Sequence, residues 1–173
     1  MAKRKKNNTK LYLTLVAVLL SIVGVCLFLF LNSAQFFIND KVFEEQAYTG
    51  LQITFGYTGK FSAGPINTSA EILSFSFGNL VPLILVVAGI VLSLIGKNSK
   101  IFGFVGGGLL IVAAAFFVFA PQMTMLQADF KSVLDNTLGL LKQTFGFKAA
   151  IGAYLGATFT GLAGICSILK VLF

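Results

Sequence analysis

The residues of this chain that could do chemistry are few, and the densest group of them is a short acidic stretch. Asp40, Glu44 and Glu45 lie close together, and their carboxylate oxygens are ligands that a hard cation accepts. The same spacing is typical of a solvated surface, which is the interpretation we favour. We therefore expect no metal site here.

Other reactive groups are scarce. The chain has no His and only two Cys, Cys26 and Cys166, each isolated within an apolar segment. A zinc site needs several such ligands, and acid–base or nucleophilic catalysis needs a positioned pair of groups. We predict no catalytic, cofactor-binding or metal-binding residues, and a protein that is not an enzyme.

Composition indicates where the chain resides. Hydrophobic residues make up 57% of it, charged residues 11%, and the mean hydropathy is +0.90, far from the averages of soluble proteins. The net charge of +7 is concentrated in a basic head, residues 1–10, rather than spread over a surface that could bind nucleic acid. We predict an all-α integral membrane protein with no nucleic-acid partner.

Four apolar runs predict a four-transmembrane-helix bundle that forms a single membrane domain. The spans are expected at about 11–32, 72–96, 101–120 and 147–172. A cleaved signal peptide is the rival interpretation of the first run, which is longer than a typical signal h-region. The second span should bend near Pro82.

Small residues predict how these helices pack. Gly103 and Gly107 have the small-xxx-small spacing that allows a neighbouring helix to approach closely, and Gly152 and Gly156 repeat it in the last span. We predict helix–helix contacts at all four glycines.

Two polar segments remain, outer loop 1 (33–71) and outer loop 2 (121–146). Residues 33–46 favour an amphipathic turn or short helix, and residues 47–63 a small β-hairpin turning near 56–59, with a ragged loop as the alternative. Residues 122–142 have helical periodicity and predict an amphipathic helix. Its apolar side should comprise Met123, Leu126, Phe130, Val133, Leu134, Thr137, Leu138 and Leu141. That side packs against loop 1 or lies on the outer leaflet, and we prefer the packing.

Charge placement sets the expected orientation. With a cytoplasmic amino terminus, the inner side carries eight cations: Lys3, Arg4, Lys5, Lys6, Lys10, Lys97, Lys100 and Lys170. The outer side carries five: Lys41, Lys60, Lys131, Lys142 and Lys148. This asymmetry predicts that both termini are cytoplasmic in the plasma membrane. Cys26 and Cys166 then lie near opposite leaflets, too far apart for a disulfide.

The layout resembles that of claudin-like and tetraspanin-like four-span proteins, which carry a structured outer segment between two of their helices. The claudin outer loop has a tryptophan motif and a cysteine pair, whereas this chain has no Trp and no loop Cys. The resemblance is therefore one of layout. A Lys-rich, Phe-rich composition without His or Trp hints at an AT-rich bacterial genome.

These observations lead to an expected function. We expect a non-enzymatic scaffold or accessory subunit that uses its outer loops to contact another membrane or surface protein, or a second copy of itself. The expected contact residues are aromatic: Phe43, Tyr48, Phe55, Tyr57 and Phe61. The basic head, Lys3, Arg4, Lys5, Lys6 and Lys10, should contact anionic inner-leaflet lipid. The alternative is an oligomeric pore or a small-solute transporter.

Overall fold

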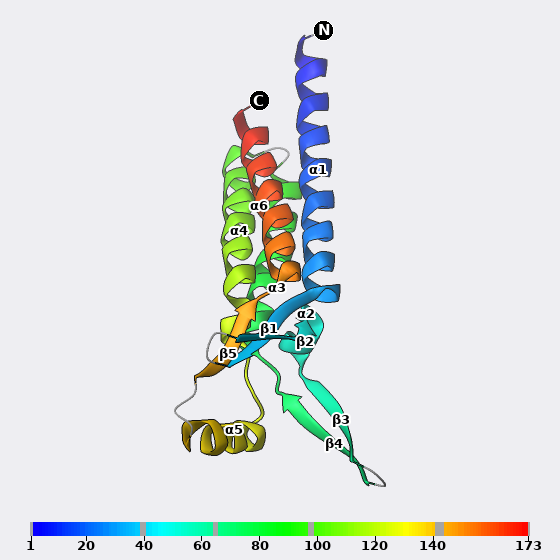
Figure 1. Ribbon diagram of the computed structural model, residues 1–173. Helices are drawn as coiled ribbons and strands as arrows, with labels where there is room; N and C mark the ends of the chain where they lie inside the picture. The colour runs from blue at the N-terminus through cyan, green and yellow to red at the C-terminus, as the bar shows by residue number, and fades with distance from the viewer. Residues whose placement is uncertain (1, 39–40, 64–65, 97–98, 141–143, 173) are drawn as a thin grey trace.

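Four long helices and a small β-rich cap make up the molecule (Figure 1). The computed structural model describes the chain except for residues 1, 39–40, 64–65, 97–98, 141–143 and 173. Within the described elements, side chains are not described at 2–8, 41–46, 60–63, 66–70, 130, 134 and 137–140.

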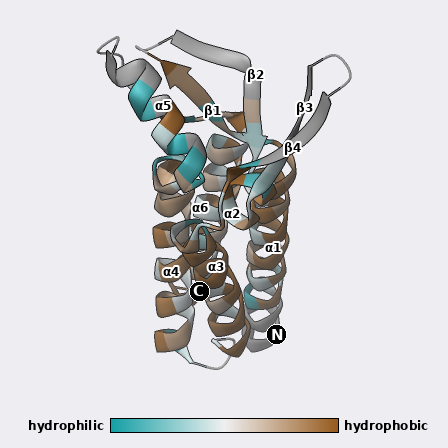
Figure 2. Ribbon diagram, turned by 90° about the horizontal axis from the view of Figure 1, so that it is seen from below, coloured by the Kyte–Doolittle hydropathy of each residue, from teal (hydrophilic) through white to brown (hydrophobic). Residues whose placement is uncertain are grey.

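The long helices are α1 (Ala2–Phe30), α3 (Phe77–Ile95), α4 (Lys100–Phe119) and α6 (Ile151–Leu172). They run side by side, with both termini at one end of the bundle and all strands at the other (Figure 1). Each is long and apolar enough to cross a membrane. Most of the bundle is apolar, while hydrophilic residues gather in the cap (Figure 2).

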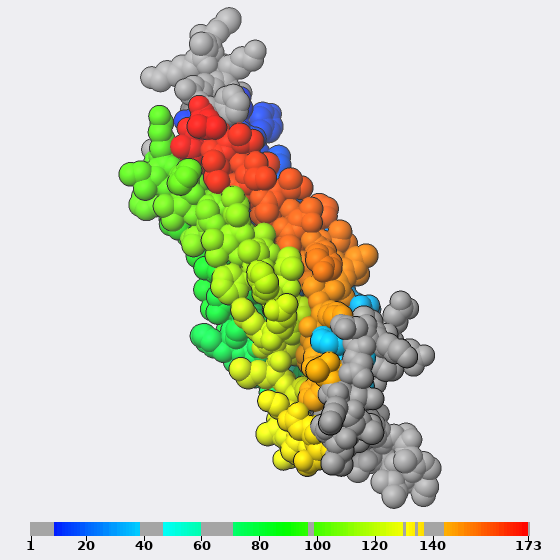
Figure 3. Space-filling model, turned by 60° about the vertical axis from the view of Figure 1, so that its left-hand side comes forward, coloured from blue at the N-terminus to red at the C-terminus, as the bar shows by residue number. Residues whose placement is uncertain are grey.

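Each long helix of the bundle packs mainly on the next one in the order α1, α6, α4, α3. Helix α1 packs on α6, α6 on α4 and α4 on α3, whereas α1 and α3 meet much less. Figure 3 shows α4 and α6 side by side along the outer surface. Near the cap, Phe28 of α1 stacks on Phe117 of α4, with ring centroids 4.4 Å apart. This pair forms part of a core that continues into the cap.

Glycines lie at the helix crossings. A Cβ on Gly156 of α6 would lie 2.8 Å from the Cβ of Phe28 and 3.0 Å from the carbonyl oxygen of Gly24, both on α1. A Cβ on Gly107 of α4 would lie 2.8 Å from the carbonyl oxygen of Gly164 on α6. The backbones can approach this closely only because these positions lack side chains.

The cap contains two sheets. The three-stranded antiparallel sheet has the order β2 (Lys41–Thr49), β1 (Asn32–Ile38), β5 (Phe145–Ala149). Strands β3 (Tyr57–Ala63) and β4 (Ile66–Leu73) form an antiparallel hairpin. Strand β1 begins two residues after the end of α1, and β5 ends two residues before α6, so the paired strands β1 and β5 continue the packed pair α1 and α6.

Outer loop 1 differs from the prediction in its secondary structure. Residues 33–46, expected as an amphipathic turn or short helix, lie mainly in β1 and β2. The physical reason is non-local, because Ala34 and Phe36 are buried against a core that includes Phe147. No local pattern reveals a pairing partner more than a hundred residues away.

The predicted hairpin exists, but it lies further along the chain. Residues Gly50–Phe55 form the short helix α2, and Thr49 and Gln52 form a capping box at its N-terminus. Gly56, at φ 96°, caps the end of α2, and β3 starts at the next residue, Tyr57. The expected turn near 56–59 is therefore wrong, and the link between β3 and β4 lies outside the described residues.

The second span begins later than predicted. Helix α3 starts at Phe77 rather than near 72, because Ile72 and Leu73 belong to β4 and pair with the segment after α4. Pro82 is buried inside α3, past its first turn. The last span also begins later, at Ile151, since Phe147 lies in β5.

The amphipathic helix is shorter than predicted. The 3₁₀ turn η1 (Ala120–Met123) follows α4, and α5 spans Ala128–Leu140 rather than 122–142. Met123 and Leu126 therefore lie outside it, and Leu126 forms a β-bridge with Leu73. Within α5, Val133 is 61% exposed, contrary to the expected packing against loop 1.

Candidate functional site

An aromatic cluster joins the two sheets of the cap. The ring centroid of Tyr48 on β2 lies 5.7 Å from that of Tyr57 on β3 and 5.9 Å from that of Phe147 on β5. Phe147 in turn lies 5.6 Å from Phe36 on β1. Edge-to-face pairs at these distances each contribute about 0.5–1.5 kcal/mol beyond area burial. The cluster holds the hairpin to the sheet.

The predicted contact aromatics separate into three groups. Tyr48 and Tyr57 belong to the cluster and are partly buried against the core. Phe55 is 55% exposed and lies on α2, beside the bundle. Phe43 and Phe61 fall at positions whose side chains lie outside those described.

The buried environment of Tyr48 makes the cap sensitive to alkali. Burial, and then the neighbouring Tyr57, raises the pKa of Tyr48 above the ordinary tyrosine value of 10.0. In the unfolded chain Tyr48 therefore ionises at a lower pH than in the folded chain. Neutral Tyr48 stabilises the folded cap fully below pH 10.0, and this contribution is lost as pH rises through the higher pKa of the folded state. We expect Tyr48→Phe to lessen the loss of cap stability in alkali, measured by thermal unfolding between neutral pH and alkali.

A groove of about 570 Å³ lies beside this cluster, along β5. Its walls are two runs of consecutive residues, 145–147 of β5 and 124–128, which ends at the first residue of α5, with Lys131 of α5 beside the second run. The remaining lining residues are Ser74, Pro121 and Gln122. Consecutive lining residues mean that the groove follows two backbones.

The wall of the groove opposite β5 is an extended segment, and one edge of this segment pairs with the end of β4. Ser74 N donates to Met125 O at 3.1 Å, and Gln127 N donates to Ile72 O at 3.0 Å, flanking the bridge between Leu73 and Leu126. In antiparallel geometry this pattern turns the N–H and C=O of Leu126 away from β4. Strand β5 is itself the edge of its sheet.

A buried asparagine ties this region to the bundle. Asn79 of α3 is fully buried and donates through Nδ2 to Ile53 O at 2.8 Å and to Thr124 Oγ1 at 3.2 Å. Ser76 Oγ donates to Met123 O at 2.7 Å. These bonds connect α2, α3 and the segment after α4, so the groove is held on a rigid base.

A polar cluster that was not predicted from the sequence lies at the other end of the bundle. Lys170 is 2% exposed, and its Nζ donates to Ser93 O at 2.5 Å. Ser93 Oγ and Ser167 Oγ lie 2.8 Å apart, and Ser167 Oγ donates to Gly103 O at 3.2 Å. The cluster ties α6 to α3 and α4. Its signal in the sequence was the pair of serines inside apolar runs.

The predicted packing glycines all lie at contacts between elements. Gly103 abuts Val171 and Lys170 of α6, and Gly107 abuts Ile168 and Gly164 of the same helix. A Cβ on Gly152 would meet Ser33 Oγ and the carbonyl oxygens of Asn32 and Leu31, where α6 passes the start of β1. Gly156 lies at the α1 crossing.

The charged residues singled out in the sequence do not gather into a described site. Asp40 lies outside the described residues, and Glu44 and Glu45 lie on β2 at positions without a described side chain. Lys3, Arg4, Lys5 and Lys6 belong to the first turns of α1, where side chains are likewise not described, and Lys10 is partly exposed. Among the described residues, no group of three or more His, Cys, Asp or Glu could hold a metal ion.

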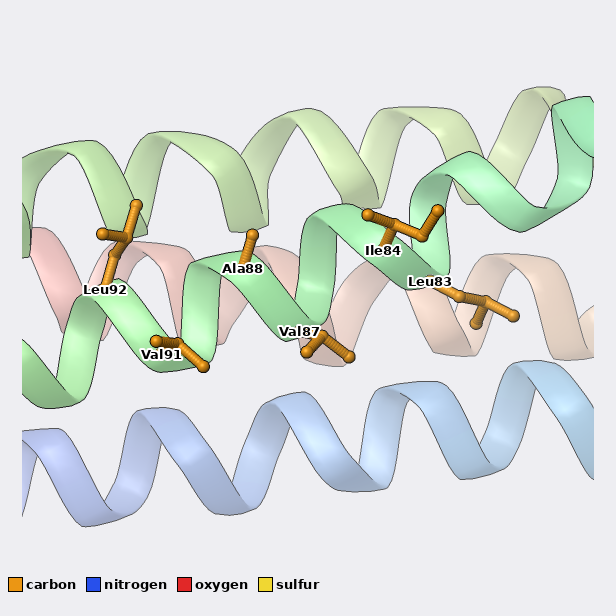
Figure 4. A pocket seen from close by; sticks show the side chains of 6 residues that line it. All are labelled: Leu83, Ile84, Val87, Ala88, Val91 and Leu92. Carbon is orange, nitrogen blue, oxygen red and sulfur yellow. The ribbon is translucent and has the colours of Figure 1, made fainter.

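A second groove, of about 590 Å³, runs along the outer face of α3 (Figure 4). It is lined by Leu83, Ile84, Val87, Ala88, Val91 and Leu92. None of these side chains carries a polar group, so the groove offers apolar contact alone.

No family model, curated protein or solved structure matches this chain.

Proposed function

We propose that the four long helices cross a membrane with the cap outside and both termini in the cytoplasm. The 19 residues of α3 give a length of about 28 Å, close to the roughly 30 Å hydrocarbon core. Apolar side chains are exposed along every one of the four helices. The excess of Lys and Arg at the end that holds both termini favours this orientation.

Within that membrane, the chain serves as a non-enzymatic accessory subunit whose cap binds another protein. The observation that carries this proposal is the continuity of the cap with the bundle, since β1 and β5 extend from the packed pair α1 and α6. Such a base holds the cap in a fixed orientation. Pre-organised surfaces of this kind lose little entropy on binding.

The groove beside β5 is the part of the cap best suited to a partner. It lies between the edge strand β5 and the outward backbone groups of Leu126, and each of these can pair with an added strand. The matching ligand is an extended segment of a partner protein, with Phe145, Met125 and Lys131 contacting its side chains.

Site-specific photo-crosslinking in intact cells tests this proposal. A photoreactive residue at Lys131, which lines the groove, should form an adduct with a different protein. The matched control is Asn136, an exposed position on another side of α5, which should give no such adduct. Equal adducts at both positions would contradict a specific groove.

Removing one backbone donor sharpens the test. Leu126→Pro deletes the N–H that points away from β4 while leaving the bonds of Met125 and Gln127 to β4 in place. We expect this variant to lose most of the Lys131 adduct, and Leu126→Ala to retain it. An adduct consisting only of a second copy, together with solute flux through reconstituted liposomes, would instead support an oligomeric pore.

A further inference from the structure

Large apolar side chains are exposed where the cap meets the bundle. Phe55 of α2 is 55% exposed, Phe75 is 49% exposed and Phe77, the first residue of α3, is 65% exposed. The rings of Phe55 and Phe75 lie 6.4 Å apart, and Leu51 of α2 is also exposed. These four residues are called the wedge below.

The wedge lies at the level of the helix ends. A Cβ on Gly50, the first residue of α2, would contact the backbone carbonyl of Phe28, which precedes the end of α1 by two residues. Ser76 N donates to Thr54 O at 3.0 Å, and Asn79 Nδ2 bonds to Ile53 O at 2.8 Å. Helix α2 therefore runs beside the last turn of α1 and the first turn of α3 (Figure 1).

Other exposed aromatics occur at the same ends of the helices. Phe30 at the end of α1 is 67% exposed, Phe119 at the end of α4 is 51% exposed, and Tyr154 near the start of α6 is 54% exposed. Together with the wedge they continue the apolar outer surface of the bundle to the edge of the cap. Aromatic residues at this depth are typical of a membrane–water interface.

The chemistry of the wedge selects lipid over a soluble partner. Neither 51–55 nor 74–78 contains a charged residue. An exposed apolar patch is costly in water but favourable against acyl chains. Its continuity with the exposed apolar faces of α1 and α3 places it against whatever surrounds those helices.

We propose that Leu51, Phe55, Phe75 and Phe77 insert into the outer leaflet at the boundary between headgroups and acyl chains. This inference rests on the membrane location given under "Proposed function". It assigns Phe55 to lipid rather than to the protein partner expected from the sequence. The wedge thereby fixes the height of the cap over the bilayer.

The absence of Trp from the chain allows a clean test. Phe55→Trp, reconstituted in phosphatidylcholine and phosphatidylglycerol vesicles, carries a single indole. We expect lipids with brominated acyl chains to reduce its emission about twofold, as for a side chain a few ångströms below the headgroups, and aqueous iodide to have little effect. Phe75→Trp should give the same result, and it replaces Phe55→Trp as the test variant if Phe55→Trp does not fold.

Two controls separate the wedge from the membrane location. Phe104→Trp, exposed one turn after the start of α4, should be quenched by brominated lipid, and Asp129→Trp, exposed on α5, only by iodide. If Phe104→Trp is quenched by lipid and both wedge variants only by iodide, the wedge is overturned while the membrane location stands. If Phe104→Trp is not quenched by lipid, the membrane location itself fails.

Discussion

The Gly156→Leu variant should fail to fold, because α1 and α6 touch through their backbones at this position. A single Cβ at Gly156 already lies 2.8 Å from Phe28 Cβ and 3.0 Å from Gly24 O. Neither neighbour is the end of a flexible side chain, so the helices must separate. Separation would also disturb the stacked pair of Phe28 and Phe117. We expect Gly156→Ala to lose about 1–3 kcal/mol and Gly156→Leu considerably more.

The same chain supplies the matched control for this prediction. A Cβ on Gly108 of α4 would meet nothing within 4 Å. Gly108→Ala should therefore be neutral or gain up to about 1 kcal/mol, the usual benefit of replacing glycine within a helix. The stability of the variants is compared by heating each one in mild detergent and measuring how much of it still elutes as a single peak. A Gly156→Leu protein as stable as Gly108→Ala would refute the α1–α6 contact.

Replacing Lys170 with methionine should also destabilise the bundle. The carbonyl of Ser93 is among the last four of α3, which have no partner within their own helix, and Lys170 Nζ bonds to it at 2.5 Å. Methionine keeps the apolar stem but removes the ammonium donor from this buried carbonyl. A hydrogen bond from a cation contributes about 1.5–3 kcal/mol, and the C-terminal dipole of α3 adds about 0.3–1 kcal/mol.

Desolvation of the ammonium opposes this effect, since a buried charge is expensive. We expect the loss of this hydrogen bond to outweigh the relief of desolvation. Ser93 and Ser167 are buried, so water cannot replace the ammonium as the donor. The net loss should be about 2 kcal/mol, measured by thermal unfolding in detergent. Lys100→Met, at an exposed position, should change stability by less than about 0.5 kcal/mol. A more stable Lys170→Met protein would show that desolvation dominates.

The helices of the bundle could be predicted from the sequence, and so could the presence of a hairpin in the cap, whereas the three-stranded sheet could not. A long apolar run predicts a helix from local sequence alone, because each helix satisfies its own backbone hydrogen bonds. The strand β1 depends on β5, which lies more than a hundred residues further along the chain. Residues 72 and 73 illustrate the resulting error, since their apolar character suits a span but their backbone pairs with residues 125–127.

The candidate site was predictable in part. Tyr48, Tyr57 and Phe55 were singled out as residues that contact a partner, which stays a prediction. Composition does not say which aromatic residues face inward, and Tyr48 and Tyr57 pack against the core. The groove beside β5 arises from two segments that acquire their neighbours only in the folded chain. The burial of Lys170 was missed because its position near the chain end resembled a topology signal.

Orientation across the membrane is tested most directly by cysteine labelling of intact cells. In a chain with Cys26 and Cys166 replaced by alanine, a single cysteine is placed at Thr58 on β3 or at Lys100 at the start of α4, both exposed positions. A membrane-impermeant maleimide added outside should label position 58, and position 100 only after the membrane is opened. Labelling of position 100 from outside, or protection of position 58, would contradict a four-helix membrane protein with an external cap.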